Sequence, residues 1–165
     1  MNGDVFSDVI AANQAYADAY VDQQLPARAA KGLAVLTCMD SRIEPLAMLG
    51  LVPGDAKILR NAGARVTDDV LRTLVLANYL LGVERVMVVA HTKCRMAAES
   101  EDAVHDAVAA AGGPDTRSIS FLTAADQRVA LAHDVQRIRS YPYLSGVIAG
   151  GFLLDITTGA LEQVV

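Results

Sequence analysis

Two cysteines and one histidine stand where two apolar segments of the chain end. The segment Leu-Ala-Val-Leu-Thr at 33–37 runs directly into Cys38, and Val-Met-Val-Val-Ala at 86–90 runs directly into His91. Cys94 follows His91 by three positions, a spacing that lets both side chains turn back toward one point. Ligands bind at the carboxyl ends of the strands in open parallel sheets. Cys38 and His91 would therefore emerge side by side if the two segments form neighbouring strands.

Two thiolates and one imidazole form a donor set that suits Zn²⁺. Three protein ligands leave the fourth tetrahedral position for water, which is the arrangement of a catalytic zinc site rather than a structural one. The chain has 2 cysteines in all, and its other histidines, His105 and His133, fall in helical contexts. A single buried Cys or a single His has an ordinary structural explanation. The three together predict a catalytic zinc site.

The pattern of apolar residues along the chain predicts which elements position these side chains. Continuous apolar runs at 33–37 and 86–90 predict strands that are buried on both faces. Further strands are predicted at 57–60, 146–156 and 160–165. Helical spacing and capping residues predict helices, at 4–22, 43–49, 67–81, 95–111 and 123–140. Strands that alternate with helices predict a single α/β domain with a mainly parallel central sheet, an antiparallel edge strand and flanking helices. Residues 1–32 would form an N-terminal helical arm and linker, and residues 33–165 the zinc-binding core.

Composition restricts the partners of the protein. A net charge of -5 without any basic block makes nucleic acid and anionic membranes poor partners. No apolar stretch approaches the roughly 18 residues of a membrane span, and the N-terminus lacks the features of a signal peptide, so we expect a cytoplasmic location. The hydrophobic content of 53% lies on the apolar side for a domain of this size. Together with the amphipathic N-terminal helix, it predicts a homodimer or a dimer of dimers.

Three short motifs resemble those of the β-carbonic anhydrases, in particular the small bacterial members. Cys38-Met39-Asp40-Ser41-Arg42 is similar to their C-x-D-S-R motif, and His91-Thr92-Lys93-Cys94 to their H-x-x-C motif. Arg60-Asn61-Ala62-Gly63 resembles the R-N-A-G segment between them. The order and separation of the motifs match, and the similarity spans about residues 33 to 160.

The resemblance implies reversible hydration of carbon dioxide to bicarbonate and a proton through zinc-bound hydroxide. Cys38, His91 and Cys94 would bind Zn²⁺. Asp40 would accept a hydrogen bond from the hydroxide, and Arg42 would hold Asp40 away from the metal through charge-assisted bonds.

Other residues are weaker candidates. Ala62 and Gly63 of the R-N-A-G segment are candidate substrate-binding residues. His105 or His133 could pass a proton to buffer, although solvated helix residues are the commoner case. Gln14 lies in the region from which some family members supply a glutamine that binds bicarbonate, but no motif fixes it.

Arg95 departs from the family pattern, and Lys93 is a second cation on the other side of Cys94. Many members have Gly or another small residue after the second Cys, where this chain has Arg95. Two cations near the site should attract anions such as bicarbonate, and they could also narrow access to the metal. The departure leaves the three ligands intact and leaves the shape of the pocket open.

Two other functions stay open from the sequence. Hydrolases of carbonyl sulfide and carbon disulfide resemble β-carbonic anhydrases and use the same zinc ligands, and the shape of the pocket decides between the substrates. A non-catalytic zinc protein with a regulatory or scaffolding role is the second alternative. A thiol phosphatase is disfavoured because Cys38 and Arg42 are too close in sequence, and no glycine-rich nucleotide motif is present.

Overall fold

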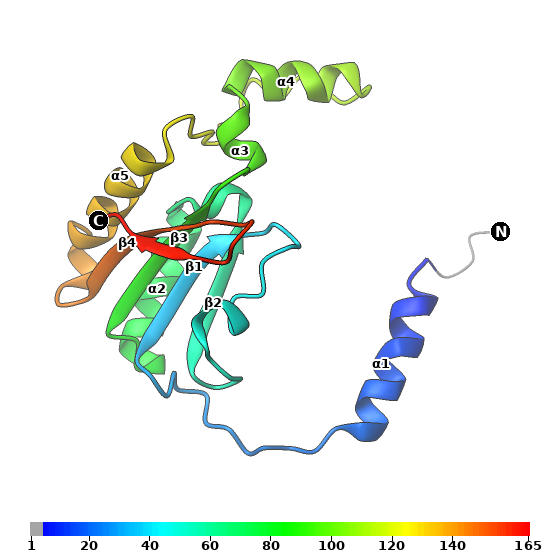
Figure 1. Cartoon of the computed structure of the whole chain (residues 1–165), viewed down its shortest axis with the longest axis vertical. Coiled ribbons are helices and arrows are strands. Elements are labelled where there is room, and N and C mark those ends of the chain that lie inside the picture. Colours follow the sequence, from blue (N-terminus) through cyan, green and yellow to red (C-terminus); the bar gives the residue numbers. More distant parts are fainter. Residues whose placement is uncertain (1–4) are drawn as a thin grey trace.

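A five-stranded sheet forms the centre of the molecule in the computed structural model, which describes residues 5–165 (Figure 1). The strand order is β2-β1-β3-β4-β5. The strands are β1 (Leu33–Cys38), β2 (Ala56–Asn61), β3 (Arg85–His91), β4 (Ile148–Leu154) and β5 (Leu161–Gln163). β2, β1, β3 and β4 are parallel, and β5 pairs with β4 in the antiparallel sense. The prediction of a mainly parallel α/β sheet with an antiparallel edge is confirmed.

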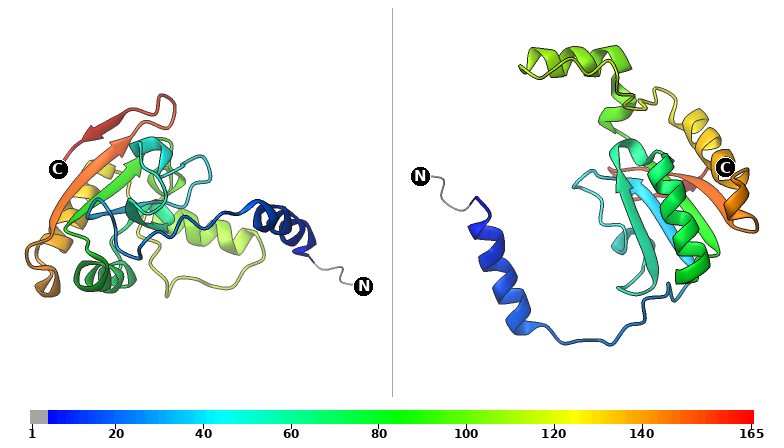
Figure 2. Two further views of the ribbon diagram at one scale, coloured as in Figure 1. Left: turned by 90° about the horizontal axis from the view of Figure 1, so that it is seen from below. Right: turned by 180° about the vertical axis from the view of Figure 1, so that it is seen from behind.

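Two long helices cover one face of this sheet. These two helices are α2 (Asp68–Leu81) and α5 (Gln127–Arg139). The other α-helices of residues 5–165 are α1 (Ser7–Ala19), α3 (Arg95–Ala98) and α4 (Glu101–Ala110). Figure 2 shows α2 and α5 lying side by side against the same face of the sheet. α3 and α4 extend beyond the carboxyl end of β3. This arrangement leaves the carboxyl ends of β1 and β3 to be covered by loops.

The strands divide the core into two layers because successive side chains point to opposite faces of a sheet. Leu36 and Val88 belong to the cluster that packs with α2 and α5, and both are fully buried. Val35 and Val89 belong to the cluster on the other face, together with Cys38 and Cys94. β1 and β3 are therefore buried on both sides, as their continuous apolar sequences predict.

Three predicted helices differ from those observed. Only Ala47–Leu49 of the range 43–49 is helical, as a 3₁₀ turn that Gly50 ends in the left-handed conformation. The continuous helix predicted for 95–111 is wrong, because the chain is extended at Glu99 and Ser100 caps α4 by accepting from the Ala103 amide. The helix predicted from residue 123 begins at Gln127, where the Asp126 side chain accepts from two backbone amides.

Helix α2 agrees closely with its prediction. The Thr67 side chain accepts from the Val70 amide at its start, and Gly82 ends it with a φ of 72°. A left-handed terminal residue is the conformation that glycine adopts without steric cost. The two signals used in the prediction are thus the two caps that the structure contains.

The N-terminal helix stands apart from the rest of the chain. None of the residues of α1 is buried, and an extended segment joins the helix to β1 (Figure 1). The helix is shorter than the predicted range 4–22, and its predicted first residue, Asp4, lies outside the described residues. Within residues 5–165, no helix is long and apolar enough to cross a membrane.

Candidate metal centre

The three predicted metal ligands come together at the carboxyl ends of β1 and β3. Cys38 is the last residue of β1, His91 is the last residue of β3, and Cys94 immediately precedes α3. The two strands are parallel neighbours in the sheet. β1 continues to β2 on one side and β3 to β4 on the other, so the site lies where the strand order reverses. Open α/β sheets bind ligands at such a point.

The geometry of the three donor atoms fits a metal ion. The Sγ atoms of Cys38 and Cys94 are 4.0 Å apart, and the ligand atoms of all three residues lie within 4.8 Å of one another. A tetrahedral zinc ion with Zn–S bonds of about 2.3 Å would place its two sulfur ligands about 3.8 Å apart. The three residues are buried, which shields a bound ion from competing ligands in solvent.

His91 presents one free nitrogen to the two sulfur atoms. Its Nδ1 lies 2.9 Å from the Thr92 carbonyl oxygen, which can only accept, so Nδ1 carries the proton. Nε2 is then an unprotonated acceptor in the neutral ring, and it is buried without a hydrogen-bond partner among the described residues. A buried polar atom without a partner is costly, and a metal ion would supply the partner.

The contact between the two thiols shifts their pKa values in opposite directions. The hydrogen bond with Cys94 lowers the pKa of Cys38 well below its ordinary value. The same contact raises the pKa of Cys94 above its ordinary value, because a second negative charge beside the first is unfavourable. Ligating thiols must lose their protons, so the lowered pKa of Cys38 favours metal binding and the raised pKa of Cys94 opposes it.

Asp40 and Arg42 form a pair directly beside the three ligands. Arg42 donates from Nε to Asp40 Oδ1 at 2.9 Å, from Nη2 to Oδ2 at 2.7 Å and from its backbone amide to Oδ1 at 3.0 Å. These bonds hold the pKa of Asp40 far below its usual range. Asp40 Oδ2 lies 3.8 Å from His91 Nε2, so an ionised carboxylate borders the site while its oxygens stay bonded to the guanidinium.

Further residues, which the sequence did not assign to the site, hold its loops in place. Arg60 donates to the carbonyl oxygens of Cys38 and Asp40 at 3.0 and 2.6 Å. Gln127 donates to the His91 carbonyl oxygen at 2.8 Å. Arg60 lies within the R-N-A-G segment, so its motif was a usable signal. No sequence motif marked Gln127, because only the packing of α5 brings this residue to the end of β3.

A cleft of about 490 Å³ opens onto the two cysteines. Met39, Ala62 and Met96 give it apolar walls, and Arg42 and Arg95 also line it. Of the two candidate substrate-binding residues, Ala62 lines this cleft. Gly63 does not line it, and its amide instead donates to Cys38 Sγ at 3.4 Å.

The two cations that flank Cys94 in the sequence have different surroundings. Lys93 donates to the Thr157 hydroxyl at 3.0 Å, and its carbonyl oxygen accepts from Arg42 at 3.3 Å. The Arg95 side chain is 79% exposed and lies 3.7 Å from Glu99. Only Arg95 of these two lines the cleft.

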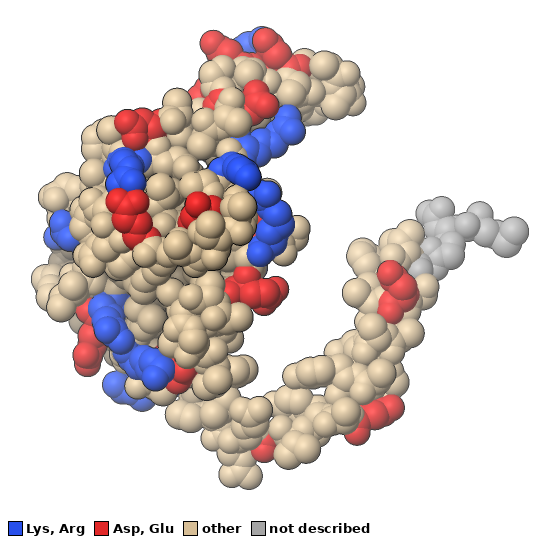
Figure 3. Space-filling view, viewed as in Figure 1, with Lys and Arg blue, Asp and Glu red and all other residues tan. Residues whose placement is uncertain are grey.

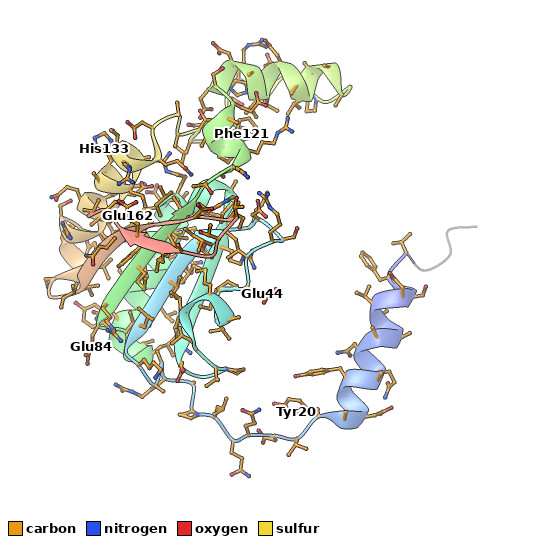
Figure 4. All side chains as sticks on the ribbon, in the orientation of Figure 1. Tyr20, Glu44, Glu84, Phe121, His133 and Glu162 are labelled. Atoms are coloured by element: carbon orange, nitrogen blue, oxygen red, sulfur yellow. The ribbon has the colours of Figure 1, made fainter. Side chains whose placement is uncertain are left out.

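The remaining candidates lie away from the cleft walls. His105 is buried rather than solvated, its Nδ1 is 2.9 Å from the Thr116 hydroxyl, and its ring packs against Phe121. His133 is an exposed residue of α5 (Figure 4). Gln14 lies on α1 and donates to Asp18 at 2.8 Å. None of the three lines the cleft at Cys38 and Cys94.

Comparison with known proteins places this site in a family. Residues 33–151 match the family model described as carbonic anhydrase. The chain is 32% identical over 163 residues to beta-carbonic anhydrase 1 of Mycobacterium tuberculosis, with 97% of this chain and 98% of that protein covered. It is also 48% identical over 62 residues to a carbon disulfide hydrolase of Acidianus, which covers 38% of this chain and 30% of that protein.

Structural comparison extends the similarity to the whole chain. The crystal structure of a carbonic anhydrase from Streptococcus mutans superposes with a TM-score of 0.91 at 34% identity, and 100% of each chain is covered. The match of the family model and the similarity over full length agree with the geometry at the ends of β1 and β3. The chain belongs to the β-carbonic anhydrase family.

Proposed function

We propose that this protein catalyses the reversible hydration of carbon dioxide to bicarbonate and a proton, with Zn²⁺ held by Cys38, His91 and Cys94. The observation that carries the proposal is the ionised Asp40 carboxylate, bonded to Arg42 and 3.8 Å from the free nitrogen of His91. A metal site with a charged, restrained acceptor at its border suits activation of water. Zinc, when bound, lowers the pKa of its water from about 15.7 to about 7.

Asp40 is the residue that orients the attacking water. An ionised carboxylate can only accept hydrogen bonds, so it draws an O–H toward itself and turns a lone pair toward the substrate. Arg42 keeps the carboxylate available for this role, because the guanidinium occupies both oxygens in a fork geometry and competes with direct ligation of the metal.

The cleft suits the change in polarity between substrate and product. Carbon dioxide is apolar, and the walls at Met39, Ala62 and Met96 offer it little competition from water. Bicarbonate is an anion, and the guanidinium groups of Arg42 and Arg95 on the same cleft favour its approach and departure. Ala62 is the proposed substrate contact on the wall, and Gly63 acts behind it, on the sulfur of Cys38.

Stopped-flow hydration of carbon dioxide on protein of measured zinc content tests the proposal. We expect one zinc per chain and a rate of hydration that falls when the metal is removed and returns when zinc is restored. A protein that is fully loaded with zinc but does not hydrate carbon dioxide would contradict the proposal and favour the non-catalytic alternative.

A hydrolase of carbon disulfide or carbonyl sulfide is the second candidate. The specific support is the similarity to the Acidianus carbon disulfide hydrolase over 62 residues. The same ligands and the same Asp40–Arg42 pair could serve this reaction, since each substrate is a small linear molecule. Parallel assays with the three substrates on one zinc-loaded preparation discriminate between the activities, and the substrate with the highest kcat/KM identifies the reaction.

We further propose that the chain works as a homodimer or a dimer of dimers. α1 exposes apolar side chains, among them Val9 at 58% and Tyr16 at 64%, and buries none. The arm is also free of basic side chains from residue 5 to 25, and its drawn surface is largely uncharged (Figure 3). A helix of this kind is stabilised when it packs on a second copy. A cytoplasmic location stays a prediction from the sequence.

A further inference from the structure

The loop after β2 brings a backbone donor to one of the proposed metal ligands. Gly63 has a φ of 78°, and its amide nitrogen lies 3.4 Å from Cys38 Sγ. A Cβ at this position would lie 3.1 Å from Met96 Cβ. The left-handed backbone and the close approach both require glycine. The direction of this N–H bond therefore depends on how firmly the loop is held.

The Asn61 side chain joins the start of this loop to its end at Arg65. Its Oδ1 accepts from the Arg65 amide at 2.8 Å, and its Nδ2 donates to the Arg65 carbonyl oxygen at 2.7 Å. The two bonds join the residues that flank Gly63. The backbone that carries Gly63 is thus fixed between Asn61 and Arg65.

The Arg65 side chain is anchored in turn by a buried carboxylate on α5. Arg65 Nε donates to Asp134 Oδ2 at 2.7 Å, and Nη1 donates to the Leu122 carbonyl oxygen at 2.6 Å. The side chains of Arg65 and Asp134 are only 15% and 8% exposed. A buried ion pair is weak evidence for stability, because desolvation offsets its attraction. Its effect on geometry is the stronger explanation for its presence behind the metal centre.

We propose that Asp134 is a positioning residue that, through Arg65 and Asn61, holds the Gly63 amide on the Cys38 sulfur and so sets the donor strength of that thiolate. The inference rests on the proposed role of Cys38 as a metal ligand. An N–H bond to a thiolate withdraws electron density from the sulfur, which then donates less charge to a bound metal. Partners outside the ligand set tune metal centres in this way.

The test uses cobalt and zinc as probes, because Co²⁺ bound by thiolates has a sulfur-to-metal charge-transfer band that reports on the sulfur. The variants are Asp134→Asn and the double variant Arg65→Met/Asp134→Leu, which removes both charges and fills the space with apolar side chains. Glu162→Gln is the matched control. Glu162 of β5 pairs with Arg128, which lies on α5 as Asp134 does, but the side chains of this control pair are both more than half exposed (Figure 4).

We expect the band to move to longer wavelength in both test variants and to stay in place in Glu162→Gln. Zinc affinity, measured by competition with a chromophoric chelator, should weaken by about 10–100-fold in the test variants, because a loop that no longer holds Cys38 in place costs more binding free energy than a stronger sulfur donor adds. If Asp134→Asn does not fold, the double variant carries the same expectation without leaving an unpaired buried charge.

Folded variants with an unchanged band and unchanged zinc affinity would overturn the positioning role. These readouts need no substrate, so the result is separate from that of the hydration assay. A protein that shows the expected shifts but does not hydrate carbon dioxide would refute the proposed activity and leave the inference about Asp134 standing.

Discussion

The metal centre and the N-terminal arm use apolar residues in opposite ways. At the ends of β1 and β3, Cys38, His91 and Cys94 are buried and are surrounded by loops that hydrogen bonds hold in place. In α1 the apolar residues are exposed, and no residue is buried. The three donor side chains of the first region all come from one chain. The second has an apolar surface that nothing within residues 5–165 covers.

This difference teaches that the two regions should respond separately to substitution. The donor atoms of the centre are placed by strand pairing, so a change there should affect metal and activity before it affects assembly. α1 contributes no ligand to the centre, so a change on its apolar stripe should affect assembly before it affects metal content. Each variant below is therefore measured for both zinc content and molecular mass.

The largest expected effect is the loss of metal on removal of a thiolate. Cys94→Ala leaves one sulfur and one imidazole, too few to hold zinc in a tetrahedral site. We expect zinc content to fall from one per chain to nearly none, with the molecular mass unchanged. Metal analysis after dialysis measures this, and full zinc occupancy in the variant would refute the ligand assignment.

The next largest effect concerns the pair that borders the metal. Arg42→Ala removes the bonds that hold Asp40, so the carboxylate can turn to the metal and occupy the position of water. We expect zinc to be retained and kcat/KM for carbon dioxide to fall by roughly 10²–10³-fold.

The pH profile sharpens this prediction. Arg42 depresses the pKa of Asp40, so in the unaltered protein Asp40 stays ionised from pH 6 to 9 and does not set the rate profile there. Asp40→Asn should also retain zinc but orient water poorly, because an amide donates as well as accepts. Unaltered activity of Arg42→Ala over this whole range would rule out the restraining role.

Substitution on the apolar stripe of α1 should act on assembly alone. Val9→Asp with Tyr16→Asp places two charges on the side that we expect to pack on a partner. Because burial of each side chain contributes about 1.5–3 kcal/mol, the dissociation constant should rise by at least about 100-fold. Light scattering across a dilution series measures it.

The control for the arm is Ala11→Asp, which adds charge on the opposite side of the same helix. It should leave the mass unchanged, and all arm variants should keep their zinc. A monomeric unaltered protein at micromolar concentration would contradict the proposed assembly, whatever the variants do.

The smallest expected effect is on stability behind the centre. Gln127→Ala leaves the His91 carbonyl oxygen without the 2.8 Å bond from Gln127, and an unpaired carbonyl of this kind costs about 1–3 kcal/mol. Denaturant unfolding of the metal-free protein at fixed concentration measures this loss. Arg128→Ala, at the adjacent exposed ion pair, should change the free energy of unfolding by less than about 1 kcal/mol. An equal loss of free energy of unfolding in the two variants would refute the role of Gln127 in stabilising the site.

Most of the sheet could be predicted because its signals are local. Continuous apolar runs identified β1 and β3, and Thr67 and Gly82 marked both ends of α2. The break between α3 and α4 was missed because residues 95–111 are rich in helix-forming residues throughout. The capping interaction of Ser100 with the Ala103 amide ends that continuity, and a serine inside an alanine-rich segment is too common to mark a boundary.

The sequence by itself determined the chemistry of the centre: two sulfur donors, one imidazole, and a carboxylate and guanidinium close enough along the chain to pair. Those signals are readable because ligand type and short spacing are properties of the chain. Only the tertiary structure decided what supports them. Gln127 reaches His91 and Asp134 reaches Arg65 because α5 packs against the sheet. Arg65 and Asp134 are 69 positions apart in the sequence. Such contacts depend on the angle and register of packed elements, which no short segment of sequence specifies.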